Sequence, residues 1–187
     1  LDELRPGDEI KLILVADNPG RREQAAENRR YLVGPSGKLA EGFFRARSEL
    51  GIDFRKQVLI LNKTPVHTPR TAELKDLAKL GGERVAAAIR ASQRTMAELI
   101  LDFHRALGPV PLWIIGYSEL PKGKLFEPFA AALGELYGAE EPLRETVCLF
   151  RHFSMNQFSV DIRKRSLPGE SVAETLRRVG GDRKSVV

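Results

Sequence analysis

Polar residues follow four apolar runs of the sequence, and their types are suited to binding a polar ligand or a water molecule. Asp17 and Asn18 come directly after one run, Asn62 and His152 end two others, and Gly116 closes a fourth. A carboxylate accepts hydrogen bonds, while amides and an imidazole can both donate and accept them. Because open α/β sheets bind ligands beyond the carboxyl ends of their strands, we expect these residues to share one edge.

The apolar runs that carry these residues have the composition of buried strands. They are continuous rather than alternating, as in parallel strands covered on both faces, and they span residues 9–16, 57–62, 110–116 and 145–151. Helical spacing of apolar residues lies between them, over residues 36–51, 83–108 and 126–138. This alternation predicts an α/β protein, a three-layer α/β/α fold around a central four-stranded parallel sheet in the order 2-1-3-4.

Length and composition limit the class of protein. The 187 residues, 42% of them hydrophobic, are enough for one core, so we expect a single domain over residues 1–187 with a flexible tail over 180–187. The net charge of +5 and a pI near 9.5 favour a polyanionic partner. A single cysteine, Cys148, excludes a disulfide framework and a cysteine-ligated metal, and we expect no metal and no cofactor.

The location of the protein is predicted from what the sequence lacks. No segment approaches the roughly 20 apolar residues that cross a bilayer, and no signal-peptide pattern is present. We therefore expect an intracellular protein, cytoplasmic and nucleoid-associated in a bacterium, that is a monomer and has no membrane partner.

Residues 33–39, VGPSGKL, look like the end of a phosphate-binding P-loop but fail that motif. Leu32 stands where the P-loop needs glycine, and Leu39 stands where it needs serine or threonine. The Gly-Pro-Ser-Gly turn is instead expected to open a helix, whose free N–H groups can approach a substrate or a backbone phosphate.

Five motifs together resemble the uracil-DNA glycosylase superfamily in order and in spacing. They are ADNPG (16–20), LVGPSGKL (32–39), VLILN (58–62), WIIG (113–116) and RHFS (151–154), and they extend over nearly the whole chain. The first motif is similar to the G-E-x-P-G of the thermophile-type branches, and its N-P-G matches the G-x-N-P-G of the mismatch-specific branch. The four cysteines of the iron–sulfur branch are missing, because this chain has one cysteine.

The resemblance implies a monofunctional DNA glycosylase of base-excision repair. Such an enzyme hydrolyses the N-glycosidic bond of uracil, or of a related deaminated base, after the base has flipped out of DNA. By the same resemblance, Asn18 positions the attacking water, with Asp17 as the alternative, and His152 stabilises the departing base anion. Cleavage builds negative charge on the base, so a site of this kind needs hydrogen-bond donors aimed at the base oxygens.

The resemblance also implies which residues contact the base. Asn62 matches the asparagine that reads its polar edge, and Gly20 belongs to the first motif. Family members usually carry a phenylalanine just before the V-G pair, where it stacks on the base. Leu32 stands at that position and Tyr31 precedes it. Either Tyr31 supplies the stacking ring after a small shift, or the base pocket differs.

A third group of residues is expected to contact DNA. Gly34, Ser36 and Lys38 belong to the helix-opening motif. Ser154 ends the RHFS motif and is expected to contact DNA as well. Met155, Gln157 and Phe158 follow directly, where the family carries its intercalating loop. The basic run behind them is expected to hold phosphates; it consists of Arg163, Lys164 and Arg165. An exposed loop followed by a solvated charge run is the alternative interpretation.

A second hypothesis belongs to another functional class. The altered stacking position at Leu32, and Phe153 in place of the proline of the family's H-P-S motif, also fit a protein that binds nucleic acid on a glycosylase fold without cleaving it.

Overall fold

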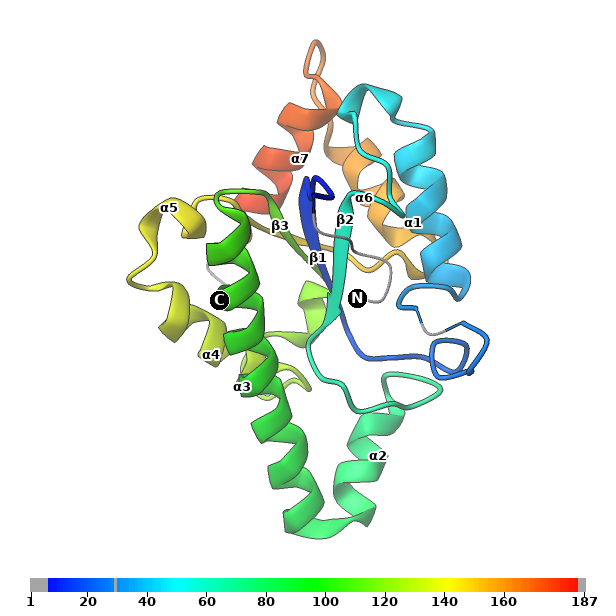
Figure 1. The fold of residues 1–187 in the computed structure, drawn as a ribbon, viewed down its shortest axis with the longest axis vertical. Coiled ribbons are helices and arrows are strands. Elements are labelled where there is room, and N and C mark those ends of the chain that lie inside the picture. The colour runs from blue at the N-terminus through cyan, green and yellow to red at the C-terminus, as the bar shows by residue number, and fades with distance from the viewer. Residues whose placement is uncertain (1–6, 29, 185–187) are drawn as a thin grey trace.

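The computed structural model describes residues 7–28 and 30–184, which form an α/β fold around one sheet (Figure 1). Its strands are β1 (Leu12–Ala16), β2 (Val58–Asn62), β3 (Leu112–Ile115) and β4 (Val147–Phe150). All pairings are parallel and the order is β2-β1-β3-β4, which confirms the predicted topology. In register, Ala16 pairs with Asn62 and Ile115 with Phe150, so the strands end at a common edge.

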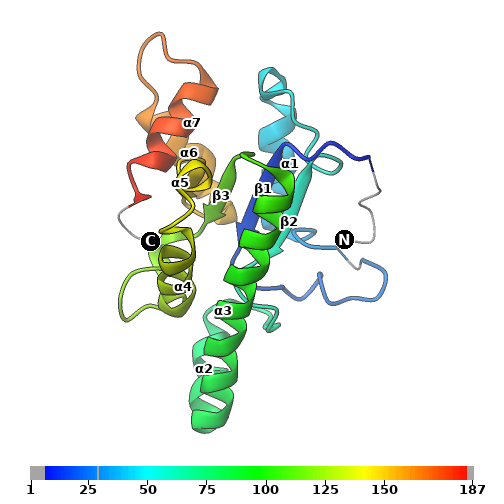
Figure 2. The same ribbon diagram turned by 60° about the vertical axis from the view of Figure 1, so that its left-hand side comes forward.

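Helices cover both faces of the sheet (Figures 1 and 2). One face carries α3 (Gly82–Leu107), α4 (Glu127–Tyr137) and the short α5 (Glu141–Arg144). The other face carries α1 (Pro35–Arg45), α6 (Gln157–Arg165) and α7 (Val172–Gly181). Helix α2 (Glu73–Leu80) packs against the first half of α3, and the two project from the body. Short 3-10 turns are η1 (Ser48–Leu50), η2 (Tyr117–Glu119) and η3 (Ser154–Asn156).

Alternation along the strands divides the core into two clusters. Successive side chains of a strand point to opposite faces, so Ile13 and Val15 pack towards α3 and α4, while Leu12 and Leu14 pack towards α1 and α6. The second cluster is rich in aromatic rings that contact one another, including Phe43, Phe44, Trp113, Phe150, Phe153 and Phe158. All the sheet strands are therefore covered on both faces, as their continuous apolar sequences predicted.

Part of the predicted C-terminal tail packs against the body of the protein. Gly180 and Gly181 belong to α7, and a Cβ added at Gly180 would lie 2.6 Å from the Cβ of Cys148. Arg183 donates to the carbonyl of Leu149 at 3.3 Å and pairs with Asp161 at 2.7 Å. Residues of the predicted tail, among them Gly180 and Arg183, therefore contact β4 and α6, and residues 185–187 of that tail lie outside the described residues.

In the part of the chain that the structure describes, no helix combines the length and apolar character needed to cross a membrane. Cys148 is buried in β4 as a core residue.

Candidate active site

The carboxyl ends of β1, β3 and β4 surround a cavity of about 630 Å³. The loop after β1 contributes Asp17 and Asn18, the turn after β3 contributes Gly116, and the segment after β4 contributes His152 and Ser154. The start of α1 contributes Gly34 and Ser36 to the opposite wall. The cavity thus brings together residues from four distant parts of the sequence, as the strand-edge argument predicted.

Asp17 is one of the carboxylates that line this cavity. Its side chain is 13% exposed, and its Oδ1 accepts a hydrogen bond of 2.5 Å from Nζ of Lys63. Gly116 lies against it with a φ of +80°, and a Cβ at that position would come within 2.6 Å of Oδ1. The glycine is therefore required twice, for the left-handed backbone and for the close approach of the carboxylate.

Asn18 is occupied by contacts that hold a neighbouring loop. Its Nδ2 donates to the hydroxyl of Thr68 at 2.9 Å and to the carbonyl of Val66 at 3.2 Å, and its Oδ1 accepts from the hydroxyl of Thr71 at 2.9 Å. His67 reinforces the same junction, because its Nδ1 lies 2.9 Å from the carbonyl of Pro19. Asn18 lines the cavity, but its amide serves mainly to fix residues 66–71 beside it.

His152 faces the cavity as a hydrogen-bond donor. The backbone N–H of Ser154 donates to its Nδ1 at 3.1 Å, so in the neutral ring the proton is on Nε2. Burial lowers the pKa of His152, an effect that the Asp17 carboxylate opposes and the Lys63 cation reinforces. The imidazole is therefore neutral at pH 7 and can offer Nε2–H to a ligand.

Asn62 ends β2 at the same edge but lies behind the cavity wall. Its side chain is buried, and neither Nδ2 nor Oδ1 has a hydrogen-bond partner among the described residues. It does not line the cavity in this structure, so the prediction that Asn62 faces a common cleft with Asn18 and His152 is not met. A buried amide without partners is costly, by roughly 1–3 kcal/mol, and is therefore a candidate for contact with a ligand.

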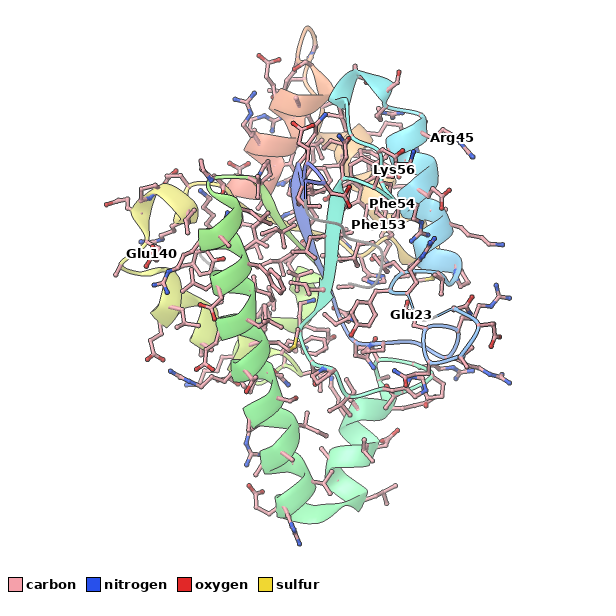
Figure 3. The ribbon with its side chains drawn as sticks, in the orientation of Figure 1. Glu23, Arg45, Phe54, Lys56, Glu140 and Phe153 are labelled. Atoms are coloured by element: carbon pink, nitrogen blue, oxygen red, sulfur yellow. The ribbon has the colours of Figure 1, made fainter. Side chains whose placement is uncertain are left out.

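Leu32, and not Tyr31, lines the cavity at the expected stacking position. Leu32 has a φ of +51°, and two hydrogen bonds and a glycine neighbour support this strained backbone. Glu23, on the loop between β1 and α1 (Figure 3), accepts from its N–H at 3.0 Å, Arg55 donates to its carbonyl at 2.9 Å, and the absence of a Cβ at Gly37 leaves room for that carbonyl.

Glu23 closes the loop that carries the first motif. Its second oxygen accepts from the N–H of Gly20 at 3.3 Å, so one carboxylate joins both ends of the β1–α1 loop. Burial raises the pKa of Glu23, and the hydrogen bonds from Gly20 and Leu32 oppose that rise.

The segment after His152 has one exposed apolar residue beside the cavity. Met155 is 81% exposed, and both it and Asn156 have positive φ, at 51° and 57°. Phe158 is fully buried among the aromatic rings of the core, so the prediction that it contacts DNA is wrong. Its apolar character reflects the helical spacing of α6, whereas the sequence predicted a loop there.

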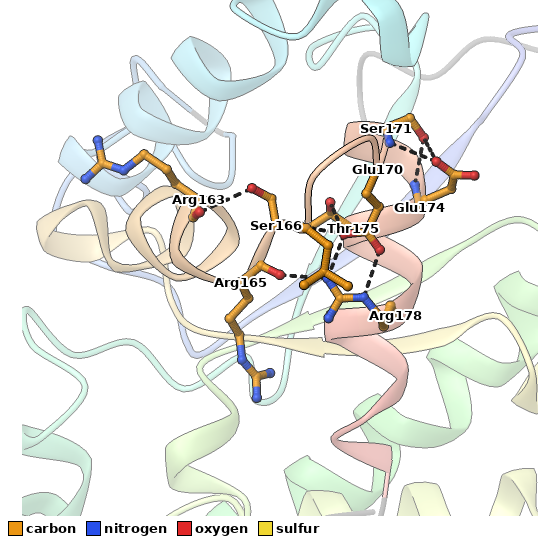
Figure 4. A network of polar contacts seen from close by, with 9 residues as sticks. Arg163, Arg165, Ser166, Glu170, Ser171, Glu174, Thr175 and Arg178 are labelled. Carbon is orange, nitrogen blue, oxygen red and sulfur yellow. Dashed lines mark hydrogen bonds and ion pairs between the residues drawn. The ribbon is translucent and has the colours of Figure 1, made fainter.

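The basic run at Arg163, Lys164 and Arg165 is distant from the cavity. These residues form the last turn of α6, which starts at the cavity with Gln157 and runs to the opposite edge of the sheet (Figure 1). Eight residues of helix separate the two ends by about 12 Å. Figure 4 shows the run at the junction with α7, where Arg178 donates to the carbonyl of Arg165. The run therefore does not line the cavity that was expected beside it.

Several residues at the site were not predicted from the sequence. Arg21, Arg22 and Arg70 line the cavity with exposed side chains, and Lys38, which was predicted, is exposed in the first turn of α1 outside the lining. Lys63 is buried behind Asp17. A lysine directly after the apolar run VLILN was a visible signal for Lys63, whereas the arginines lie in a loop without periodicity.

No family model, no curated protein and no solved structure matches this chain. Within residues 7–28 and 30–184 there is no group of three or more His, Cys, Asp or Glu side chains placed to hold a metal ion.

Proposed function

We propose that the protein is a DNA glycosylase that hydrolyses the N-glycosidic bond of uracil, or of a related deaminated base, flipped out of DNA. The observation that carries the proposal is the pairing of a carboxylate, Asp17, and a neutral imidazole, His152, in one cavity at the sheet edge. Cleavage of this bond builds positive charge on the sugar and negative charge on the base. The cavity offers one group for each charge.

The two groups have different tasks in this mechanism. The Asp17 carboxylate stabilises the sugar cation and orients the attacking water, and the Nε2–H of His152 donates to the base oxygen as the bond breaks. Asn18 supports the reaction indirectly, because its amide fixes residues 66–71 at the rim of the cavity. The water therefore belongs to Asp17 in this proposal, which was the alternative assignment from the sequence.

Asn62 supports recognition of a base edge. Its buried amide carries a donor and an acceptor that have no partners among the described residues, and a nucleobase presents complementary groups on its Watson–Crick edge. For contact, the base must enter beyond the present cavity wall or the wall must move. The first motif would line the sugar side, where Gly20 lies.

The rim of the cavity suits a DNA strand. Arg21, Arg22 and Arg70 supply positive charge, and the N–H groups at the start of α1, near Ser36, point to the same space. Met155 follows Ser154 of the cavity lining with an exposed side chain, which would act as a wedge that fills the gap left by a flipped base.

A nucleic-acid-binding protein without catalysis is the second candidate. It is favoured by Leu32, because an aliphatic side chain lines the cavity where an aromatic ring would stack on a base.

The experiment that tests the proposal is a panel of labelled oligonucleotides, each containing one deaminated base in single-stranded or double-stranded DNA. The parent protein should produce alkali-labile abasic sites from at least one of them without any added cofactor. The Asp17→Asn variant, which keeps the size of the side chain, serves as the control for contaminating activity. Binding to the panel without any cleavage would favour the second candidate.

A further inference from the structure

Lys63 is a fully buried lysine behind the candidate active site. It follows the last residue of β2, and its backbone N–H donates to the carbonyls of Ala16 and Asp17 at 2.9 and 3.1 Å. Its side chain has 0% exposure. Fully buried lysines are rare unless paired, so the contacts of its ammonium group need an explanation.

The ammonium group has a partner for each of its donors. Nζ donates to Oδ1 of Asp17 at 2.5 Å and to the carbonyl of Ile115 at 2.5 Å, and it lies 4.9 Å from the centre of the Phe126 ring. Burial lowers the pKa of Lys63, and the Asp17 carboxylate opposes this shift. Three suitable partners are the environment of an ammonium ion, so the pair is an ion pair that joins the ends of β1, β2 and β3.

Stability alone does not account for such a pair. Well-packed apolar residues often replace a buried ion pair without loss of stability. Here the partner of Lys63 is a carboxylate that lines the same cavity as His152, while no hydrogen bond from a described residue reaches the second oxygen, Oδ2. The titratable groups that face the pair are the neutral imidazole of His152, from the β4 segment, and the carboxylate of Glu119, from η2.

We propose that Lys63 is a positioning residue of the active site: it fixes one oxygen of Asp17 and balances its negative charge, so that His152 stays neutral in the same cavity. The catalytic part of this inference rests on the proposed function. Without the cation, the imidazole would face an unbalanced carboxylate and take up a proton more readily. A protonated ring would set an Nδ1–H against the N–H of Ser154 and lose the present geometry.

The test compares full-length Lys63→Met with the parent by two measurements. The first is ¹⁵N NMR titration of His152, in which the His152 pKa should rise because the cation that lowers it is gone. Asp17→Asn should move it in the opposite direction, because the carboxylate that raises it is removed. The second is the single-turnover rate of base release, which should fall about 10²-fold through misplacement of Asp17 while DNA affinity is unchanged.

The matched control is Lys75→Met, which removes a cation paired at 3.4 Å with Glu119, another carboxylate that lines the cavity. It should leave both the His152 titration and the rate as in the parent. If Lys63→Met fails to fold, Lys63→Gln carries the titration test, because it removes the positive charge and keeps an N–H donor near Asp17.

A loss of rate without a shift in the His152 titration would indicate a merely structural lysine and overturn the proposal, as would an unchanged rate. If the parent itself releases no base from any oligonucleotide, the proposed function fails. The NMR titration needs no activity, so it still decides whether Lys63 balances Asp17 at His152.

Discussion

The backbone N–H of Ser154 donates to Nδ1 of His152 at 3.1 Å, and this contact determines what the imidazole can do. It makes Nδ1 an acceptor and leaves the proton of the neutral ring on Nε2. Because burial also lowers the His152 pKa, the ring stays neutral at physiological pH. A fixed neutral donor at the end of β4 is suited to a base that acquires negative charge as its bond breaks.

The same low pKa predicts how stability depends on pH. Burial lowers the pKa of both His104 and His152 below the ordinary value of 6.5, so the unfolded chain binds more protons than the folded chain just below that pH. The free energy of unfolding should therefore fall as the pH drops from 6.5 to about 5.5. Urea denaturation at several pH values measures this slope.

The double variant His104→Gln/His152→Gln should flatten the slope in this window. Glu23 has the opposite sign, because burial raises its pKa above 4.5, and its contribution lies towards lower pH. A slope that stays the same in the double variant would contradict the assignment to these histidines.

Gly37 and Gly42 provide a test of the strained Leu32 backbone. Both lie in α1, but a Cβ at Gly37 would fall 1.5 Å from the carbonyl oxygen of Leu32, whereas nothing lies within 4 Å of one at Gly42. Gly37→Ala should lower the free energy of unfolding by at least about 3 kcal/mol. Gly42→Ala should raise it by about 0.5–1 kcal/mol, because alanine favours the helix. Equal effects in chemical denaturation would contradict the close approach of Gly37 to Leu32.

Met155 and Phe158 were both expected to contact DNA, but Met155 is exposed and Phe158 is buried, so substitutions at the two positions should have different effects. Met155→Ala should change the free energy of unfolding by less than about 0.5 kcal/mol, because the side chain is 81% exposed. It should slow base release from double-stranded DNA and spare single-stranded DNA, where no gap needs filling. Phe158→Ala should instead cost about 3–5 kcal/mol through the cavity it leaves. Equal loss on both DNA forms in Met155→Ala would argue against a wedge.

Alanine substitutions in two sets of three basic residues, one at the cavity and one at the end of α6, test where DNA binds. Replacing Arg21, Arg22 and Arg70 by alanine should reduce the slope of log affinity against log salt, by about 0.9 for each phosphate that the variant no longer neutralises. The triple alanine variant of residues 163–165 removes the same charge, but at the far end of α6. Its slope should match the parent, because about 12 Å exceeds the Debye length of roughly 8 Å at physiological salt. The reverse result would put the DNA on the other edge of the sheet.

The sequence predicted the sheet well because its signal is local. Continuous apolar runs identified all four strands, and Asp17, Asn18, Gly116 and His152 proved to line one cavity. The roles of the side chains depended on contacts that no local pattern contains. The Asn18 amide is hydrogen-bonded to Thr68 and Thr71, which lie fifty and more residues away in the sequence. The buried ammonium group of Lys63 is paired with Asp17.

The region after β4 was predicted least well, for a physical reason. Helices α6 and α7 are short, and their periodicity is interrupted by the left-handed residues Met155 and Asn156 and by the turn at residues 166–171. Packing of Phe158 and Ile162 against the aromatic core, and not local propensity, determines where α6 lies.

The role of Asp17 in base release is best measured by the single-turnover rate on uracil-containing duplex DNA, with the parent compared with Asp17→Asn and Asn18→Ala. We expect release by the parent, a loss of about 10²- to 10⁴-fold in Asp17→Asn, and a smaller loss in Asn18→Ala, with DNA affinity retained in both. Full activity in Asp17→Asn together with an inactive Asn18→Ala would assign the water to Asn18, and a parent without release from any deaminated base would contradict the proposed function.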